Sequence, residues 1–85
     1  MSTEILIIDD NADIRNILKD LIIDAGYSTR VAANYNQALI EIDKKLPDVA
    51  IIDVKLDKGD NDGIELLNHI KQKNKDVPVI IISGH

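Results

Sequence analysis

The sequence predicts a single α/β domain on a parallel sheet, with elements in the order βαβαβαβ. Short aliphatic runs alternate with longer segments in which apolar residues recur at helical spacing. The run at 4–8, EILII, is almost continuously apolar, as expected of a strand buried on both faces. Sixteen of the 85 residues are Ile and none is Phe or Trp, so the core must be aliphatic. Alternation of this kind implies right-handed crossovers with helices on both faces of the sheet.

The first half of the chain shows clear signals where helices begin and end. After the first strand, Asn11 is placed to cap a helix and Gly26 to end it in a left-handed turn. Residues 28–32 form a plausible second strand, Asn34 can cap a second helix, and Pro47 stops it. The apolar stripes of these helices are Ile14, Ile17, Leu18, Leu21 and Ile22 in the first, and Ala38, Leu39, Ile42 and Leu46 in the second.

The second half predicts two more strands around one helix. Residues 49–52 form a third strand, followed by a polar loop over 53–62. Gly63 opens a third helix, which is expected to direct Ile64, Leu67 and Ile70 inward. Residues 77–82 form a fourth strand, in which Pro78 is tolerable near the start.

Composition narrows the functional classes. The net charge is −5 with a pI near 4.7 and no basic stripe, which disfavours direct binding of nucleic acid. No apolar run is long enough to span a membrane, and the start MSTEIL does not resemble a signal peptide, so we expect a cytoplasmic protein. The absence of Cys excludes disulfides, thiol catalysis and Cys-ligated zinc.

Three aspartates follow predicted strands. Asp9 and Asp10 come directly after the first strand, and Asp53 directly after the third. If these strands are neighbours, the three carboxylates meet at the carboxyl edge of the sheet, where repulsion costs each close pair roughly 1 kcal/mol in water and about 4 kcal/mol at an effective dielectric near 20. A hard cation such as Mg2+ removes that cost, and a carboxylate oxygen beside it can attack phosphorus to give an aspartyl phosphate. Helix capping by Asp9 or Asp10 and a turn role for Asp53 are the simpler alternatives.

Three segments carry a family resemblance: ILIIDDNADIR, VAIIDVK and VPVIIISGH resemble the receiver domain of two-component response regulators, over all 85 residues. The resemblance implies a flavodoxin-like (CheY-like) parallel sheet in a three-layer α/β/α arrangement with strand order 2-1-3-4. The family continues with a further helix, strand and helix, so residues 1–85 correspond to a receiver domain without that last portion. The family's lysine after the fifth strand and any output domain are not in this sequence.

The resemblance also implies roles for individual residues. Asp53 would be the phosphoacceptor for a sensor histidine kinase. Asp10 would bind Mg2+ directly (Mn2+ being a possible substitute), Asp9 would act largely through water, and the backbone carbonyl of Lys55 would complete the protein ligands. Ser83 would move to contact the phosphoryl group. The chain would then be a signalling domain and not an enzyme with turnover.

One departure from the family pattern lies after Asp53. The family usually has Gly eight residues after the acceptor, whereas Gly63 is ten residues after Asp53. This longer loop, together with SGH after the fourth strand, looks like the NtrX group of nitrogen-regulation response regulators.

A second departure is that the fourth strand becomes an edge strand. An apolar edge invites pairing, so we expect a homodimer or a segment-exchanged oligomer through 77–82.

Other functions remain open at this point. A phosphatase using an aspartyl phosphate usually has its acids two residues apart, whereas Asp9 and Asp10 are adjacent. A flavin-binding module would need a loop of backbone N–H donors in place of the acidic segment DDNAD.

The loop LDKGDNDG faintly resembles a calcium-binding loop. The twelfth position of such a loop requires Glu, but the aligned residue here is His69. His69 therefore reads as a surface residue, and His85 as a weak candidate for phosphate or partner contact. A phosphate-independent interaction domain is the last alternative.

Overall fold

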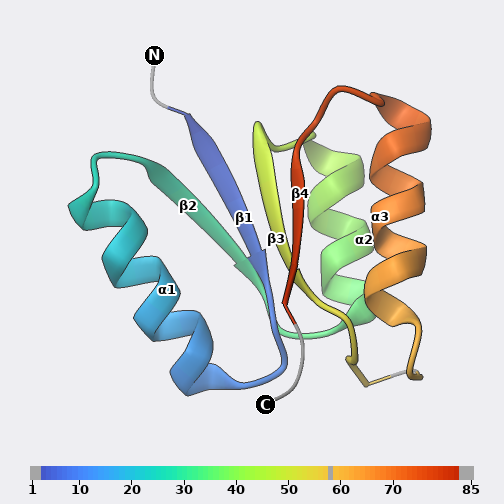
Figure 1. Ribbon diagram of the computed structural model, residues 1–85, viewed down its shortest axis with the longest axis horizontal. Coiled ribbons are helices and arrows are strands. Elements are labelled where there is room, and N and C mark those ends of the chain that lie inside the picture. The colour runs from blue at the N-terminus through green and yellow to red at the C-terminus, as the bar shows by residue number, and fades with distance from the viewer. Residues whose placement is uncertain (1–2, 58, 83–85) are drawn as a thin grey trace.

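The computed structural model describes residues 3–57 and 59–82, and it confirms the predicted α/β architecture. A four-stranded parallel sheet has the order β2-β1-β3-β4, as expected. Figure 1 shows α1 on one face of the sheet and α2 with α3 on the other, so helices cover both faces. The elements are β1 (Glu4–Ile8), α1 (Ala12–Asp24), β2 (Ser28–Ala32), α2 (Tyr35–Lys44), β3 (Val49–Asp53), α3 (Asp62–Lys73) and β4 (Val79–Ile82).

The predicted starts of α1 and α2 and the predicted turn at the end of α1 are confirmed. Asn11 Oδ1 accepts from two backbone N–H groups in the first turn of α1, and Asn34 Oδ1 accepts from the N–H of Gln37 in α2. Each bond satisfies an amide that has no partner within its own helix. Gly26 has φ of 96°, the left-handed conformation that lets the chain turn from α1 into β2.

Two boundaries differ from the prediction because of proline. α2 ends at Lys44, so Leu46 lies beyond the helix, although it still packs against the core. The residue before a proline is disfavoured in helical conformation, and Pro47 therefore ends the helix early. β4 begins at Val79 and not at residue 77, because Pro78 has no N–H for the ladder; its carbonyl accepts from the N–H of Ala50.

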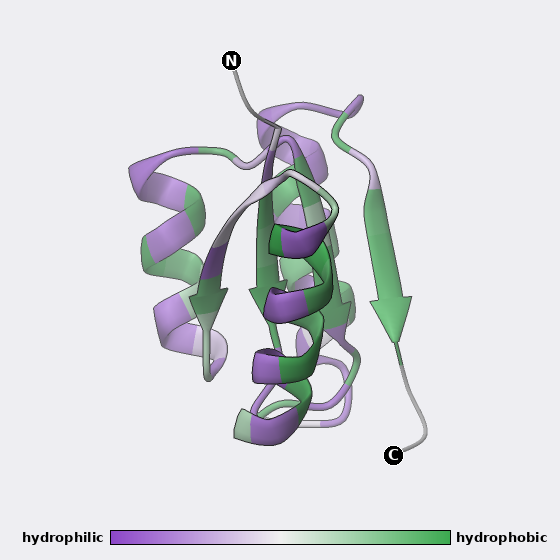
Figure 2. Cartoon of the chain, turned by 90° about the vertical axis from the view of Figure 1, so that its left-hand side faces the viewer, coloured by the Kyte–Doolittle hydropathy of each residue, from purple (hydrophilic) through white to green (hydrophobic). Residues whose placement is uncertain are grey.

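The core is unequal on the two faces of the sheet. The face under α2 and α3 is closely packed, and its buried side chains are Leu6, Ile8, Ala32, Ala38, Ile42, Ala50, Ile52, Leu66, Ile70 and Val77. The other face is covered by α1, which contributes no buried residue. The prediction that the whole α1 stripe faces inward is therefore wrong for Ile17 and Leu21, which are 57% and 62% exposed. Figure 2 shows α1 in front of the sheet, with a hydrophobic flank on the side toward β4.

The inward face of α3 also differs from the prediction. Ile64 is 43% exposed, whereas Leu66 and Ile70 are buried. Gly63 packs directly on the backbone of β3, which sets the rotation of the helix and makes 63, 66 and 70 its inner face. Within the described residues, no helix is long and apolar enough to cross a membrane.

Candidate metal and phosphoacceptor site

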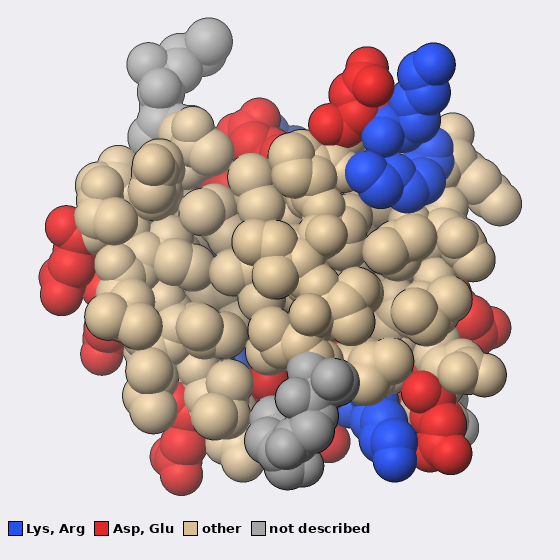
Figure 3. Space-filling view, viewed as in Figure 1, with Lys and Arg blue, Asp and Glu red and all other residues tan. Residues whose placement is uncertain are grey.

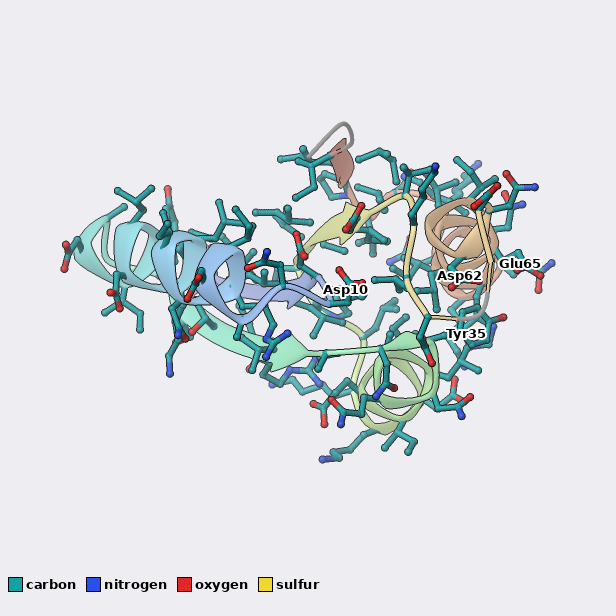
Figure 4. The ribbon with its side chains drawn as sticks, turned by 90° about the horizontal axis from the view of Figure 1, so that it is seen from below. Asp10, Tyr35, Asp62 and Glu65 are labelled. Carbon is teal, nitrogen blue, oxygen red and sulfur yellow. The ribbon has the colours of Figure 1, made fainter. Side chains whose placement is uncertain are left out.

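The three predicted acids meet at the carboxyl edge of the sheet. Asp9 and Asp10 follow β1, Asp53 ends β3, and β1 pairs with β3, so parallel register brings their side chains together. One carboxylate oxygen from each lies within 4.8 Å of the others. Asp9 and Asp53 are buried, at 0% and 1% exposure, while Asp10 is exposed. Figure 4 views this edge and shows Asp10 at the end of β1, beside the loop that leaves β3.

This geometry fits a small hard cation. Mg2+ holds oxygens at about 2.1 Å, so oxygens on opposite sides of the ion are about 4.2 Å apart. The three carboxylate oxygens lie within 4.8 Å of one another, a span that is compatible with one such ion. Without a cation, three negative groups at this spacing repel one another, and two of them are buried, where the repulsion is less screened. The residues present therefore suit a divalent ion with water in its remaining positions.

Backbone amides hold the two buried carboxylates in place. The N–H of Asn11 donates to Asp9 Oδ1 at 2.8 Å, and the N–H of Lys55 donates to Asp53 Oδ1 at 3.2 Å. Both are bonds to the second residue along the chain, which form because the chain turns sharply where each strand ends. The turn after β3 brings Lys55 beside Asp53, and the metal-binding role of its carbonyl remains a prediction.

The long loop after β3 is anchored at both ends. Asp57 Oδ1 accepts from the N–H of Tyr35 at 2.9 Å, which ties the loop to the start of α2. Asp62, buried at the start of α3, accepts from the N–H of Gly59 at 3.0 Å. Figure 4 shows Tyr35 and Asp62 along this loop, with Glu65 on the outer side of α3. These two contacts tie parts of the long loop to α2 and to the start of α3.

Gly63 brings the start of α3 against the backbone at the end of β3. A Cβ atom at this position would lie 2.6 Å from the carbonyl oxygen of Asp53 and 2.7 Å from Cα of Val54. The N–H of Gly63 also donates to the carbonyl of Val54 at 3.0 Å. The sequence indicated this glycine as a helix start and as the counterpart of the family's glycine after the acceptor, but its contact with the backbone that carries Asp53 is a feature of the tertiary structure.

Three further residues considered in the sequence are not part of the described cluster. Ser83 falls outside the described residues, as does His85, and their predicted contacts stay predictions. His69 is a partly exposed residue that lies 2.9 Å from Asp43 and links α3 to α2. The His69 ring and then Lys73 hold the pKa of the Asp43 carboxyl below its ordinary value of 3.8. His69 therefore takes part in a surface hydrogen bond between α3 and α2.

Comparison with known proteins identifies the class. The family model described as the response regulator receiver domain matches residues 5–85, and the chain belongs to this family. It is a receiver domain of two-component signalling, a class of phosphoacceptors, as the sequence resemblance implied.

The similar proteins include NtrX, as the long loop suggested. The nitrogen assimilation regulatory protein NtrX of Azorhizobium caulinodans is 41% identical over all 85 residues, and this chain spans 19% of that protein. Sporulation initiation phosphotransferase F of Bacillus subtilis is 38% identical over the whole chain, which covers 67% of it. The response regulator TrrA of Thermotoga maritima, solved in complex with Mg2+ and BeF, superposes with a TM-score of 0.87 at 29% identity, covering 98% of this chain and 70% of that one.

Proposed function

We propose that Asp53 accepts a phosphoryl group from a phosphohistidine of a sensor histidine kinase, beside a Mg2+ ion. Asp10, Asp53 and the carbonyl of Lys55 would hold the ion directly, and Asp9 would act mainly through water; Mn2+ would be a possible substitute, because it suits the same oxygen ligands. The observation that carries the proposal is the convergence of Asp9, Asp10 and Asp53 within 4.8 Å. The Mg2+ and BeF complex of the similar TrrA protein supports it.

The residues present suit this transfer. An oxygen of the Asp53 carboxylate attacks phosphorus, the P–N bond to histidine breaks, and the histidine nitrogen keeps the electron pair and takes a proton. Burial of Asp53 and the N–H of Lys55 restrict the carboxylate to one orientation, which lowers the entropy cost of reaching the transition state. When bound, Mg2+ offsets the charge that gathers on the phosphoryl oxygens.

Labelling by a small phosphodonor tests the acceptor. With acetyl phosphate and Mg2+, we expect the chain to take up one phosphoryl group and Asp53→Asn to take up none. Asp76→Asn, at an exposed aspartate near the start of β4, serves as the matched control and should label like the unchanged chain. Labelling that persists in Asp53→Asn would assign the acceptor to another residue.

Thermal unfolding with and without Mg2+ tests the metal site. An ion that binds only the folded state raises stability by mass action, by about 2.7 kcal/mol at a hundredfold excess over the dissociation constant. We expect Mg2+ to raise the melting temperature of the unchanged chain, and this increase to be lost in Asp10→Ala. The removal of a repelling charge should also make metal-free Asp10→Ala no less stable. An equal Mg2+ effect in both proteins would contradict the site.

The signalling output also belongs to this proposal. Phosphorylation would draw Ser83 toward the phosphoryl group and change a partner-binding face, in place of turnover of a substrate. We further propose that residues 1–85 act as one cytoplasmic receiver unit that does not bind nucleic acid directly, in keeping with the net charge of −5. Steady hydrolysis of a simple phosphate ester by the purified chain would contradict this reading.

For the assembly state, we propose that the chain forms a homodimer or a segment-exchanged oligomer through β4. Within the described residues β4 pairs only with β3, and Ile80 on it is 52% exposed. Figure 3 shows that the face on which β4 lies in front is broadly free of charged side chains, which gather at its rim. An apolar edge strand without charges lacks the usual protection against pairing.

A further inference from the structure

Arg15, in the first turns of α1, contacts the acidic turn without forming an ion pair. Its Nη1 donates to the backbone carbonyl oxygen of Asp9 at 2.7 Å, and the bond is partly buried. In the described part of the chain the guanidinium makes no salt bridge. A hydrogen bond from a charged donor to a carbonyl is stronger than one from a neutral donor, so this contact restrains the Asp9 carbonyl.

The bond acts on the peptide group that joins Asp9 to Asp10. Asp9 is already held at its N–H, which donates to the carbonyl of Ala32 at 3.2 Å, and at its side chain, which accepts from Asn11. Arg15 adds the third restraint, on the carbonyl. Because a peptide group is planar, fixing the Asp9 carbonyl also fixes the direction of the amide of Asp10.

Asp10 depends on this restraint more than its neighbours do. Asp9 and Asp53 are buried and bonded to backbone amides, whereas Asp10 is exposed, and among the described residues nothing hydrogen-bonds to its carboxylate. The direction of the Asp10 Cα–Cβ bond, and with it the range of positions that its carboxylate can reach, is therefore set by the backbone. The contact of Arg15 lies one peptide group away from that backbone.

We propose that Arg15 is a positioning residue for the metal site: its hydrogen bond to the Asp9 carbonyl orients Asp10 toward the cation. This role rests on the Mg2+ site proposed above. Partners of metal ligands in other proteins typically change metal affinity by about 10- to 100-fold when removed, and Arg15 acts through one peptide group, so we expect an effect near the lower end of that range.

Two variants of Arg15 and one control separate positioning from general charge. Arg15→Met removes the donor and keeps the length of the side chain, Arg15→Lys keeps a charged donor, and Lys19→Met removes an exposed cation one turn further along α1. By calorimetric titration with MgCl2, we expect Arg15→Met to weaken binding by about tenfold, Arg15→Lys by less, and Lys19→Met by under twofold. In metal-free protein, exchange of the Asp10 and Asn11 amides should speed up in Arg15→Met but not in Lys19→Met.

The outcomes distinguish this proposal from the one on which it rests. If Arg15→Met binds Mg2+ as tightly as the unchanged chain while Asp10→Ala does not bind it, the role of Arg15 is refuted and the metal site stands. If the unchanged chain binds no Mg2+, both proposals fail. Equal weakening in Arg15→Met and Lys19→Met would show a general charge effect and overturn positioning. Slow amide exchange in β3 shows that each variant is folded in the same samples. If Arg15→Met does not fold, Mg2+ binding by Arg15→Lys is compared with that of Lys19→Met instead.

Discussion

Gly63 determines how closely α3 can approach the backbone that carries Asp53. Two opposing effects act on a larger side chain here. Alanine is favoured over glycine inside a helix by up to about 1 kcal/mol. Its Cβ, however, would meet the Asp53 carbonyl oxygen at 2.6 Å, and this backbone is fixed by the pairing of Asp53 with Ile82 in β4. Because backbone atoms in a paired strand cannot shift cheaply, the collision outweighs the helix preference.

We therefore predict that Gly63→Ala lowers the free energy of unfolding by about 1–3 kcal/mol, the usual cost of overpacking. It should also weaken Mg2+ binding, because α3 and the end of β3 are pushed apart. Urea denaturation measures the first effect and calorimetric titration the second. Gly59→Ala is the matched control: its nearest contact would be an ordinary 3.9 Å to the Asp62 side chain, and its stability should change by less than about 0.5 kcal/mol. A Gly63→Ala protein as stable as the unchanged chain would refute the close-contact argument.

At the scale of elements, Arg30 joins three of them through one guanidinium. From β2 it donates to Glu4 in β1 at 2.9 Å and to the side chain of Glu41 in α2 at 3.0 Å. It also donates to the backbone carbonyl of Glu41, which accepts from the N–H of Lys45 as well, and to the carbonyl of Lys45 just beyond the end of the helix. This contact fixes where α2 ends relative to the sheet, at the edge opposite the acidic cluster.

The Glu41 contact predicts a dependence of stability on pH. Its hydrogen bonds with Arg30, and then with Lys44, hold the pKa of the Glu41 carboxyl below its ordinary value of 4.5. The stabilisation is therefore fully present above pH 4.5 and is lost as pH falls through the lower pKa of the folded state. Glu41→Gln should lower the free energy of unfolding at pH 7, by under about 1 kcal/mol because the pair is partly exposed to solvent, and the deficit should shrink at acid pH.

Urea denaturation between about pH 3 and about pH 7 measures this difference, because that range brackets the pKa of roughly 4 at which ordinary carboxylates titrate. Glu65→Gln is a suitable control, since Glu65 is an exposed side chain on α3 that forms no ion pair with the cations in the described part of the chain. A Glu41→Gln deficit that stays constant down to the acid limit would mean that the pair adds nothing through its charge.

At the scale of the whole molecule, the two faces of the sheet differ in how well they are covered. Among the described residues, α2 and α3 cover one face and enclose the hydrophobic core there, while α1 is the helix that covers the other face. Ile80 lies on the α1 side, because it pairs with Ile51, which pairs in turn with Ile7 beneath α1. The exposed apolar residues of α1 and β4 therefore belong to the same side of the molecule, in agreement with the uncharged face in Figure 3.

This asymmetry predicts which surface mediates self-association. We expect sedimentation velocity at micromolar concentration to show dimers or larger species, and Ile80→Lys to shift the distribution toward monomers, because a charge on an edge strand opposes pairing. Ile40→Lys is the matched control: Ile40 is 60% exposed but lies on α2, on the opposite face of the sheet. A monomeric unchanged chain, or equal effects of the two substitutions, would contradict association through β4.

Local sequence signals determined the elements and the acidic cluster. Aliphatic runs, asparagine caps and Gly26 act over a few residues, so they predicted the order of elements correctly. The convergence of Asp9, Asp10 and Asp53 was also predictable, because parallel strands place their carboxyl ends at one edge. The order of the strands came from the family resemblance and not from the periodicity of the residues.

Only the tertiary structure decided which faces of α1 and α3 are buried and what holds the site. The stripe of α1 is amphipathic in sequence, but whether Ile17 and Leu21 are covered depends on what packs beside that helix. The rotation of α3 depends on the contact of Gly63 with β3, and the orientation of Asp10 on Arg15. These features arise from contacts between segments, and spacing along a chain specifies periodicity within an element, not the direction in which that element meets its neighbours.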